Sequence, residues 1–246
     1  NANSILETAK VQNRNETEQM VEALRTIQAR GFLVVPGLIF GFDSDRPSLF
    51  DDTYDGVLHS GLLGGDPTFL IALPGTPLHA RMKRTGRLVE HAGDDTQALQ
   101  RERVSKVESN IRYLQPREFL VAGFIDFMRR FTSAGYMRDR FAQHVAIMRD
   151  GGVFVPDHAV GYGSLPEYLK FQFSSLGNLR RLWERGSLFL RPDRLATVLG
   201  ALWFVVRHRK TLPGLRHHFT VWVFLWSNLL LKYKTLKPED FKIYSM

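Results

Sequence analysis

The sequence contains no cysteine among its 246 residues. This absence excludes disulfide bonds, thiolate catalysis, cysteine-ligated zinc and an iron–sulfur cluster held by this chain alone. The motifs HExxH, GxxxxGK[ST], GxSxG and GxGxxG are also absent. The sequence therefore gives no support to a self-contained hydrolase or NTPase.

Long apolar runs are lacking as well. The runs at 195–206 and 219–231 have twelve and thirteen residues, fewer than the roughly 18 to 20 that cross a bilayer. Acidic residues are scarce around them: from Phe171 to Lys237, twelve lysines and arginines accompany two acids, and all four tryptophans lie there. Such runs with basic ends suit an interfacial hairpin on an anionic membrane. Two core helices with basic ends fit the same pattern.

The aromatic residues of this basic stretch sit inside the apolar runs and do not alternate with the cations. Proteins that bind single-stranded nucleic acid combine a basic groove with stacking aromatics. We therefore expect no nucleic-acid partner. The histidine pair His217-His218 lies between basic residues, and we interpret it as basic surface and not as a metal site.

The first third of the chain predicts a strand–helix–strand unit. The apolar run Phe32–Phe40 is typical of a strand buried on both faces of a parallel sheet. Residues 48–60 have the length of a crossover helix, and Thr68–Leu73 is the second predicted strand. The ligand-facing ends of this unit are the turns Gly41–Asp45 and Leu73–Pro77.

Helices are predicted on both sides of this unit. One spans Asn3–Arg30 with a break near residue 14 and a stop at Gly31, and a short one begins at Pro77. After a polar segment at 91–97, helical spacing predicts helices over 101–114, 116–132, 136–148, 165–184, 192–209 and 215–233. We therefore divide the chain into residues 1–90, with the strands, and an α-helical extension, residues 91–246.

Three sets of residues are candidates for ligand binding. Gly37 and Gly41 allow close approach to the backbone, and Asp43 offers a carboxylate to a ribose or an amine. The amides of the turn before Pro77 can face a ligand at a helix N-terminus. Arg14, with Gln12 nearby, can bind a carboxylate. Ordinary turn residues and solvated surface explain each set equally simply.

Three motifs in order carry a resemblance to a known family. They are ETAKVQN, GFLVVPGLIFGFDSD and LIALPGTPLHARMKRTGRL. Together they resemble the radical S-adenosylmethionine (SAM) enzymes, in the group with an N-terminal cobalamin-binding domain and a C-terminal helical extension. The resemblance covers roughly Ser4–Leu88, with a weaker echo from Ser109 to Glu118. Members of the group include hopanoid-pathway and bacteriochlorophyll-ring enzymes.

The resemblance implies an α/β fold: the C-terminal portion of a partial (β/α)6 TIM-type barrel, followed by the helical extension. Phe32–Phe40 and Thr68–Leu73 would be its fifth and sixth strands. Gln12 and Arg14 match positions that meet the SAM carboxylate in relatives, and Asp43 departs from the Pro-Gly-Glu that many relatives carry. The remaining implied SAM contacts are Gly37, Ile39, Gly41, Leu73, Pro74 and Thr76.

The family's CxxxCxxC loop, which binds the [4Fe-4S] cluster, follows the first strand, whereas this chain resembles the family from after the fourth. We therefore expect a fragment that is catalytically silent alone, with no metal ligands. The implied partners are the missing N-terminal portion, SAM, cobalamin, a small lipid-like or pigment substrate and an anionic membrane surface. The implied location is cytoplasmic, peripheral at the inner membrane face, and the intact enzyme would generate a 5′-deoxyadenosyl radical. The alternative is a non-catalytic membrane-binding or protein-interaction module.

Overall fold

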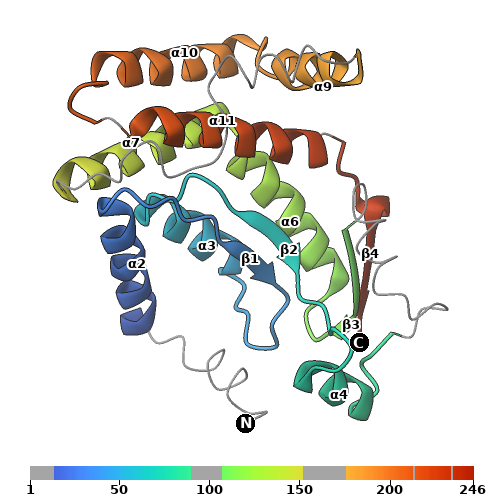
Figure 1. Ribbon diagram of the computed structural model, residues 1–246. Helices are drawn as coiled ribbons and strands as arrows, with labels where there is room; N and C mark the ends of the chain where they lie inside the picture. The colour runs from blue at the N-terminus through green and yellow to red at the C-terminus, as the bar shows by residue number, and fades with distance from the viewer. Residues whose placement is uncertain (1–13, 90–106, 152–175, 213, 234) are drawn as a thin grey trace.

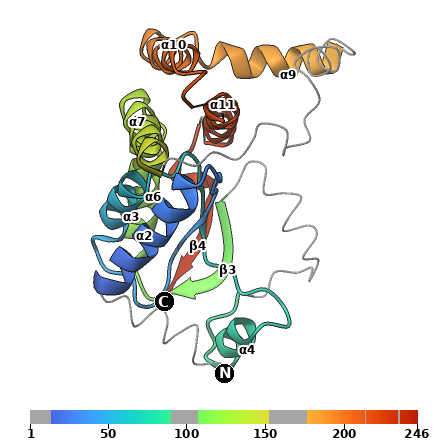
Figure 2. The same ribbon diagram turned by 60° about the vertical axis from the view of Figure 1, so that its left-hand side comes forward.

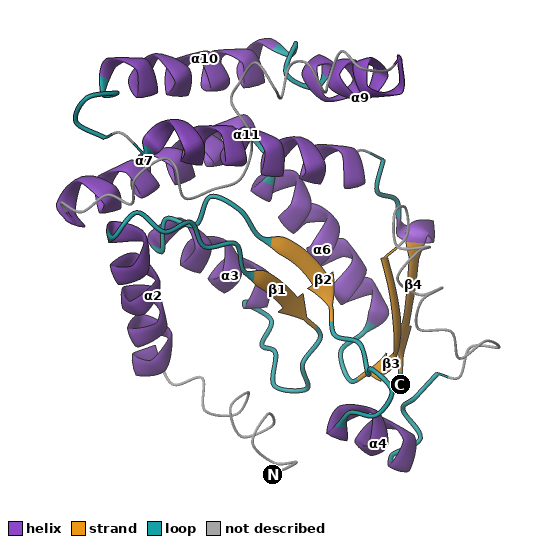
Figure 3. Cartoon of the chain, in the orientation of Figure 1, coloured by secondary structure: helices purple, strands orange, loops and turns teal. Residues whose placement is uncertain are grey.

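The computed structural model describes residues 14–89, 107–151, 176–212, 214–233 and 235–246 (Figure 1). Within these residues the fold is mixed α/β, with two small parallel sheets and no closed barrel. Figure 3 shows the two pairs of strands side by side with helices beside and above them. The helices are α2 (Arg14–Ala29), α3 (Leu49–His59), α4 (Pro77–Arg84), α6 (Arg117–Phe131), α7 (Ala134–Gly151), α9 (Leu176–Ser187), α10 (Pro192–Arg207), α11 (Leu215–Lys232) and the 3-10 helix η3 (Pro238–Asp240).

The first sheet pairs β1 (Gly37–Phe40) with β2 (Asp66–Phe69) in parallel, with Gly37 opposite Asp66 and Phe40 opposite Phe69. The expectation that Phe32–Phe40 is buried on both faces is wrong. Only its last four residues pair, and Val35 and Ile39 are 47% and 46% exposed. The reason is that helices α2, α3 and α6 lie on one side of the strands (Figures 1 and 2).

The predicted helices around this sheet are confirmed where the structure describes them; the part of the first helix before Arg14 lies outside the described residues. The crossover helix α3 is flanked by Ser48 and Ser60, and α2 ends before Gly31, whose φ of 82° suits glycine. Helix α4 begins at Pro77 because the Thr76 side chain accepts a hydrogen bond from the amide of His79. These boundaries depend on local chemistry, which is why the sequence predicts them.

A second sheet corrects the expectation for residues 101–114. Val107–Tyr113 form strand β3, not a helix, and pair in parallel with β4 (Phe241–Ser245) at the chain's end. An isolated bridge between Leu88 and Ile111 connects β3 to the segment after α4. The extension at 91–246 therefore contains strands, although helices make up most of its described part.

The sheet packs on a phenylalanine core. Its rings contact one another closely; Phe40, for example, lies 4.9 Å from Phe50 and 5.2 Å from Phe127, centroid to centroid. Aromatic pairs at such separations and tilts are favourable beyond the area they bury. The core joins both parts of the chain, since it comprises Phe40, Phe50 and Phe69 with Phe124, Phe127, Phe131 and Phe241.

A tryptophan core lies between α7, α10 and α11. Trp222 and Trp226 are fully buried and pack with Phe141, Met137 and Leu215. The expected interfacial hairpin is therefore wrong for its second arm, because α11 is a core helix. His218 on α11 is buried too, so its interpretation as surface is also wrong. No described helix is long and apolar enough to cross a membrane.

Candidate functional site

The candidate site lies where β1 and β2 end. Because the two strands are parallel and in register, the turns that follow Phe40 and Phe69 emerge at the same edge of the sheet. In Figure 1 the first turn of α2 points toward this same end of the molecule. Ligands of open α/β sheets bind outside the carboxyl ends of their strands. We therefore compare the positions of the predicted site residues with this edge.

The turn after β1 is closed by its own side chain. Asp45 Oδ2 accepts hydrogen bonds from the amides of Gly41, at 2.7 Å, and Phe42, at 2.8 Å. Burial raises the pKa of Asp45, and the two amides oppose that effect. Gly41 has a φ of 96°, and a Cβ there would collide with the Tyr113 ring. Glycine at this position thus serves packing against the protein itself.

Asp43 is held by two arginines. Its carboxylate accepts from Arg87 Nη1 at 2.8 Å and Nη2 at 2.7 Å, and Arg81 Nη2 lies 3.7 Å away. The hydrogen bonds from Arg87 hold the pKa of Asp43 below its usual value. Arg87 also donates from Nε to the carbonyl of Arg112. The Asp43 carboxylate thus fixes the β1 turn to the segment after α4.

The turn after β2 is shaped by Thr76, which caps helix α4. The Thr76 hydroxyl donates to the Leu73 carbonyl at 2.6 Å, so this side chain is used in shaping the turn. Leu73 and Pro74 are exposed, and Gly75 has a φ of 80° with open space where a Cβ would be. This backbone is accessible to a ligand.

The outer face of β1 is also open. Gly37 is exposed with nothing within 4 Å of a Cβ added to it, and Ile39 follows on the same face. Leu73 is exposed too, in the turn after β2, whereas Gly37 begins β1 and so lies at the amino end of that strand. Among the described residues β1 pairs only with β2, so its other edge is unpaired.

The sequence-predicted residues divide into three groups. Gly37 and Ile39 share the open face of β1, and Leu73 and Pro74 are exposed in the turn after β2. Gly41, Asp43 and Thr76 lie in the two turns, but the packing and hydrogen bonds described above occupy them. Arg14 is the first residue of α2, and Gln12 lies outside the described residues.

Three residues that support this edge were not predicted, because they lie in β3. The Asn110 side chain accepts from the Ala72 amide and donates to the Ala72 carbonyl, each at 2.9 Å. Tyr113 donates from its hydroxyl to the Leu70 carbonyl at 2.6 Å, and burial raises its pKa. Ser109 donates to the same carbonyl at 2.8 Å. Only the weak motif echo at Ser109-Asn110 signalled this strand.

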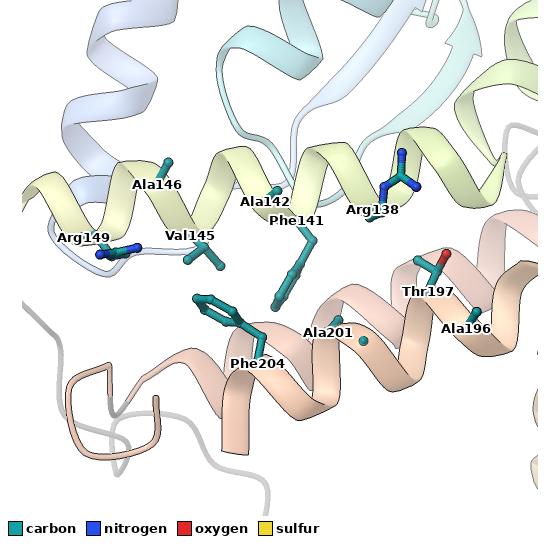
Figure 4. Close-up of a pocket in the computed structure, with 11 residues that line it drawn as sticks. Arg138, Phe141, Ala142, Val145, Ala146, Arg149, Ala196, Thr197, Ala201 and Phe204 are labelled. Carbon is teal, nitrogen blue, oxygen red and sulfur yellow. The ribbon is translucent and has the colours of Figure 1, made fainter. Parts of the chain in front are cut away.

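A separate hollow lies between α7 and α10 (Figure 4). Its volume is about 380 Å³, and Arg138 and Arg149 of α7 stand at its two ends. Small residues open it, because Ala142, Ala146 and Gly200 leave room between the helices. None of its lining residues belongs to the strand turns, so it is distinct from the candidate site.

Two of the implied cofactors, SAM and the iron–sulfur cluster, fit this chain differently. The exposed turn with Leu73, Pro74 and Gly75 leaves room for a ligand such as SAM at the carboxyl edge of the sheet. An iron–sulfur cluster does not fit, since the sequence has no cysteine and the described residues contain no group of three metal-ligating side chains. The ligands of a cluster must therefore come from another polypeptide segment.

Comparisons with known proteins agree with the motifs. No family model matches the chain, and no solved structure matches it. Over 134 residues the chain is 31% identical to a hopanoid C-2 methylase of Rhodopseudomonas palustris (strain TIE-1), a match that covers 54% of this chain. It spans only 23% of that relative's length. The similarity supports what the three motifs indicate: this chain is related to the radical SAM enzymes.

Proposed function

We propose that this chain is the C-terminal portion of a radical SAM enzyme and forms one wall of its SAM pocket. The observation that carries the proposal is the parallel, in-register pairing of β1 and β2, which brings both strand turns to one open edge. The similarity to a methylase that is about four times longer than the matched part supports it. On this proposal, β1 and β2 are the last two strands of a partial TIM-type barrel.

The unpaired edge of β1 is where the rest of the barrel would join. An exposed strand edge carries free amides and carbonyls that pair with another strand. The exposed face with Val35 and Ile39 would then turn toward the barrel interior. Both features fit a chain whose preceding strands come from the missing N-terminal portion.

Each candidate residue has a role in this pocket. The backbone at Gly37 and Ile39, with that at Leu73 and Pro74, would contact the adenosine of SAM. Gln12 and Arg14, near the first turn of α2, would bind its carboxylate. Gly41, Asp43 and Thr76 act indirectly, because they hold the two turns in shape.

The chemistry of the intact enzyme would come from groups held outside this chain. A [4Fe-4S] cluster on a CxxxCxxC loop supplies an electron to SAM in such enzymes. We assign a cobalamin-binding domain to the missing portion and a lipid-like or pigment substrate to the enzyme, by analogy with the methylase. This chain's own share is to bind SAM and keep water from the adenosine.

The first test is the coding sequence upstream of Asn1. An open frame that encodes CxxxCxxC is expected; a start site directly before Asn1, or a longer chain without the motif, would overturn the proposal.

The second test measures SAM binding to the intact protein by calorimetry. Gly37→Val places a side chain in the open space and should weaken binding about tenfold.

Gly135→Val is the matched control for this substitution. Gly135 is also exposed with open space at its Cβ position, but it lies on α7, away from the strand turns. It should leave SAM affinity unchanged. Equal affinities for the intact protein and both variants would show that this edge does not contact SAM.

A further inference from the structure

The outermost layer of the molecule consists of α9 and α10. Both views show these helices beyond α7 and α11, on the side remote from the strands (Figures 1 and 2). The inner side of α10 packs on the tryptophan core through Val198, Phe204 and Val205. Its outer side has no partner among the described residues, yet it is apolar.

This outer face is a continuous stripe. Leu195, Leu199, Leu202, Trp203 and Val206 recur at helical spacing and are all exposed, Leu199 by 53% and Trp203 by 60%. Trp183 of the neighbouring helix α9 and Leu190 of the connecting turn are exposed as well, by 69% and 62%. Soluble proteins rarely leave so many large apolar side chains together in water. We call these residues the outer apolar face.

Cations frame the outer apolar face at the end of α10. Arg207, Arg209 and Lys210 are exposed, and within the described residues none of them pairs with a carboxylate. Arg207 lies over the Trp203 ring at 5.2 Å from its centroid. The stretch from Phe171 to Lys237 holds only two acidic residues. A partner of this surface must therefore be apolar and negatively charged.

We propose that the outer apolar face docks on an anionic lipid bilayer, with α10 lying in the plane of the headgroups. Interfacial helices combine an apolar face that carries Trp and Leu with flanking lysines and arginines. Tryptophan prefers the headgroup region, and clustered cations attract anionic lipids. Helix α10 has 16 residues, too few to cross the bilayer.

A lipid surface explains these residues better than two other partners. A second protein chain would account for the apolar stripe but not for a frame of three unpaired cations, because charges are depleted at interface cores. Nucleic acid would account for the cations but not for leucines and valine between the aromatics. The docking does not rest on the SAM pocket, which lies at the strand ends.

The test is co-sedimentation of the full chain with vesicles. One set contains phosphatidylcholine alone, and the other an equal mixture of phosphatidylcholine and phosphatidylglycerol. The chain is expected to sediment with the mixed vesicles only, and less so as salt is added. Leu199→Ser with Trp203→Ser, and separately Arg209→Glu with Lys210→Glu, should each weaken binding about tenfold.

Matched controls carry the same changes elsewhere. Met20→Ser with Leu114→Ser replaces two exposed apolar residues remote from α10, and Arg84→Glu with Arg129→Glu reverses two exposed cations of α4 and α6. Both controls should bind as the unchanged chain does. Binding that is absent, or equal on both vesicle types, or lost equally in the controls would overturn the proposal.

A second copy of the chain is the remaining occupant to test. Sedimentation velocity without lipid should show a monomer. A dimer that the Leu199→Ser/Trp203→Ser variant dissociates, together with no vesicle binding, would assign the outer apolar face to self-association and overturn lipid docking. Failure of SAM binding in the intact protein would leave this result unaffected, so the two proposals fail separately.

Discussion

The two ends of the β1–β2 sheet are held by different chemistry. At the carboxyl end of β2, neutral groups of β3 bond to the backbone: Asn110 to Ala72, and Ser109 and Tyr113 to Leu70. At the amino ends, buried basic side chains from the helices bond to the carbonyls of the preceding loops, Arg140 from α7 and His218 from α11 among them. Both sets belong to residues 91–246.

This difference shows that the helical extension is part of the sheet's support. The carboxyl ends, where a ligand would bind, are set by rigid short bonds between strand neighbours. At the amino ends Arg140 is fully buried and bonds to two carbonyls, with no carboxylate beside it among the described residues. Removing a buried charged side chain leaves the carbonyls that it bonded without a partner, which costs stability. Burial also shifts the pKa of such a side chain, so stability can depend on pH. The following changes test that contrast, from the largest expected effect downward.

Arg140→Met should destabilise the protein most. Arg140 is fully buried; its Nε donates to the Leu62 carbonyl at 2.8 Å and its Nη2 to the Gly64 carbonyl at 2.7 Å. Its guanidinium also lies 4.4 Å from the Phe131 ring centroid. Burial lowers the pKa of Arg140 to about 10, so it remains charged at neutral pH. Leaving two buried carbonyls unpaired should reduce the free energy of unfolding by about 3 kcal/mol.

Urea unfolding measures this loss, and Arg138→Met is its control. Arg138 lies two residues earlier on α7, where it is exposed and pairs with the neighbouring Asp139. Its replacement should change the free energy of unfolding by less than about 0.5 kcal/mol. A similar decrease in the free energy of unfolding for both variants would show that the contacts of Arg140 with the buried carbonyls do not stabilise the fold.

Asn110→Ala tests the carboxyl end of the sheet. Its two bonds to Ala72 are both buried, so removal should cost about 2 kcal/mol in urea unfolding. The loss should be smaller than for Arg140→Met because no charged group is involved. Ser109→Ala should cost about 1 kcal/mol, since the Tyr113 hydroxyl still reaches the Leu70 carbonyl. A larger loss for Asn110 than for Arg140 would reverse the contrast between the two ends.

Near neutral pH, a pH effect on stability should arise at the amino ends. His144 Nε2 lies 2.8 Å from His218 Nδ1, while His144 Nδ1 faces Gln28 Oε1 and the Gly61 carbonyl, and His218 Nε2 faces the Gly31 carbonyl. Burial, aided by His218, lowers the pKa of His144 to about 3. Below the ordinary histidine pKa of about 6.5 the unfolded chain therefore binds a proton that folded His144 does not bind.

The sign of this linkage is a loss of stability as pH falls. Between about pH 7.5 and about pH 5.5 the free energy of unfolding should fall by about 1 kcal/mol through His144. His144→Gln removes this contribution, so its free energy of unfolding should change less over the same interval. Equal pH dependence for the two proteins, measured by urea unfolding, would show that His144 takes up a proton in the folded state.

The sequence predicts the local structure of the chain better than it predicts the difference between the two ends of the β1–β2 sheet. Helix α4 was predicted from Pro77 at its start, and α3 and α6 from their length and helical spacing. Strand β3 was not, because Glu108, Ser109 and Asn110 look unsuited to a buried strand. Their side chains bond to groups far away in sequence, at Leu70, Ala72 and Lys242.

Contacts between residues far apart in the sequence also determine which basic residues are buried and which glycines of the site are open. Charge alone does not reveal that Arg140 and His218 are buried whereas Arg207 and Lys210 are exposed. In the candidate site, glycines at the strand end were recognised by pattern. However, Gly37 faces open space and Gly41 faces Tyr113, a distinction that depends on β3.

Asp43→Asn should have the smallest effect on stability. Its ion pair with Arg87 is bidentate, but a quarter of the Asp43 side chain is exposed, so solvent screens the pair. The loss should be about 1 kcal/mol in urea unfolding near neutral pH. Because Arg87 lowers the pKa of Asp43, this stabilisation is present above the ordinary aspartate pKa and lost as pH falls through the lowered value.

Asp51→Asn is the control for Asp43→Asn, since Asp51 pairs with Arg130 on an exposed surface. It should cost less than Asp43→Asn, and the loss with Asp43 should disappear in acid. If Asp43 instead bound SAM directly, its replacement would weaken SAM binding by the intact protein without changing the unfolding of this chain. A fall in both together means that the carboxylate acts by holding the β1 turn against Arg87 and hence shapes the pocket edge.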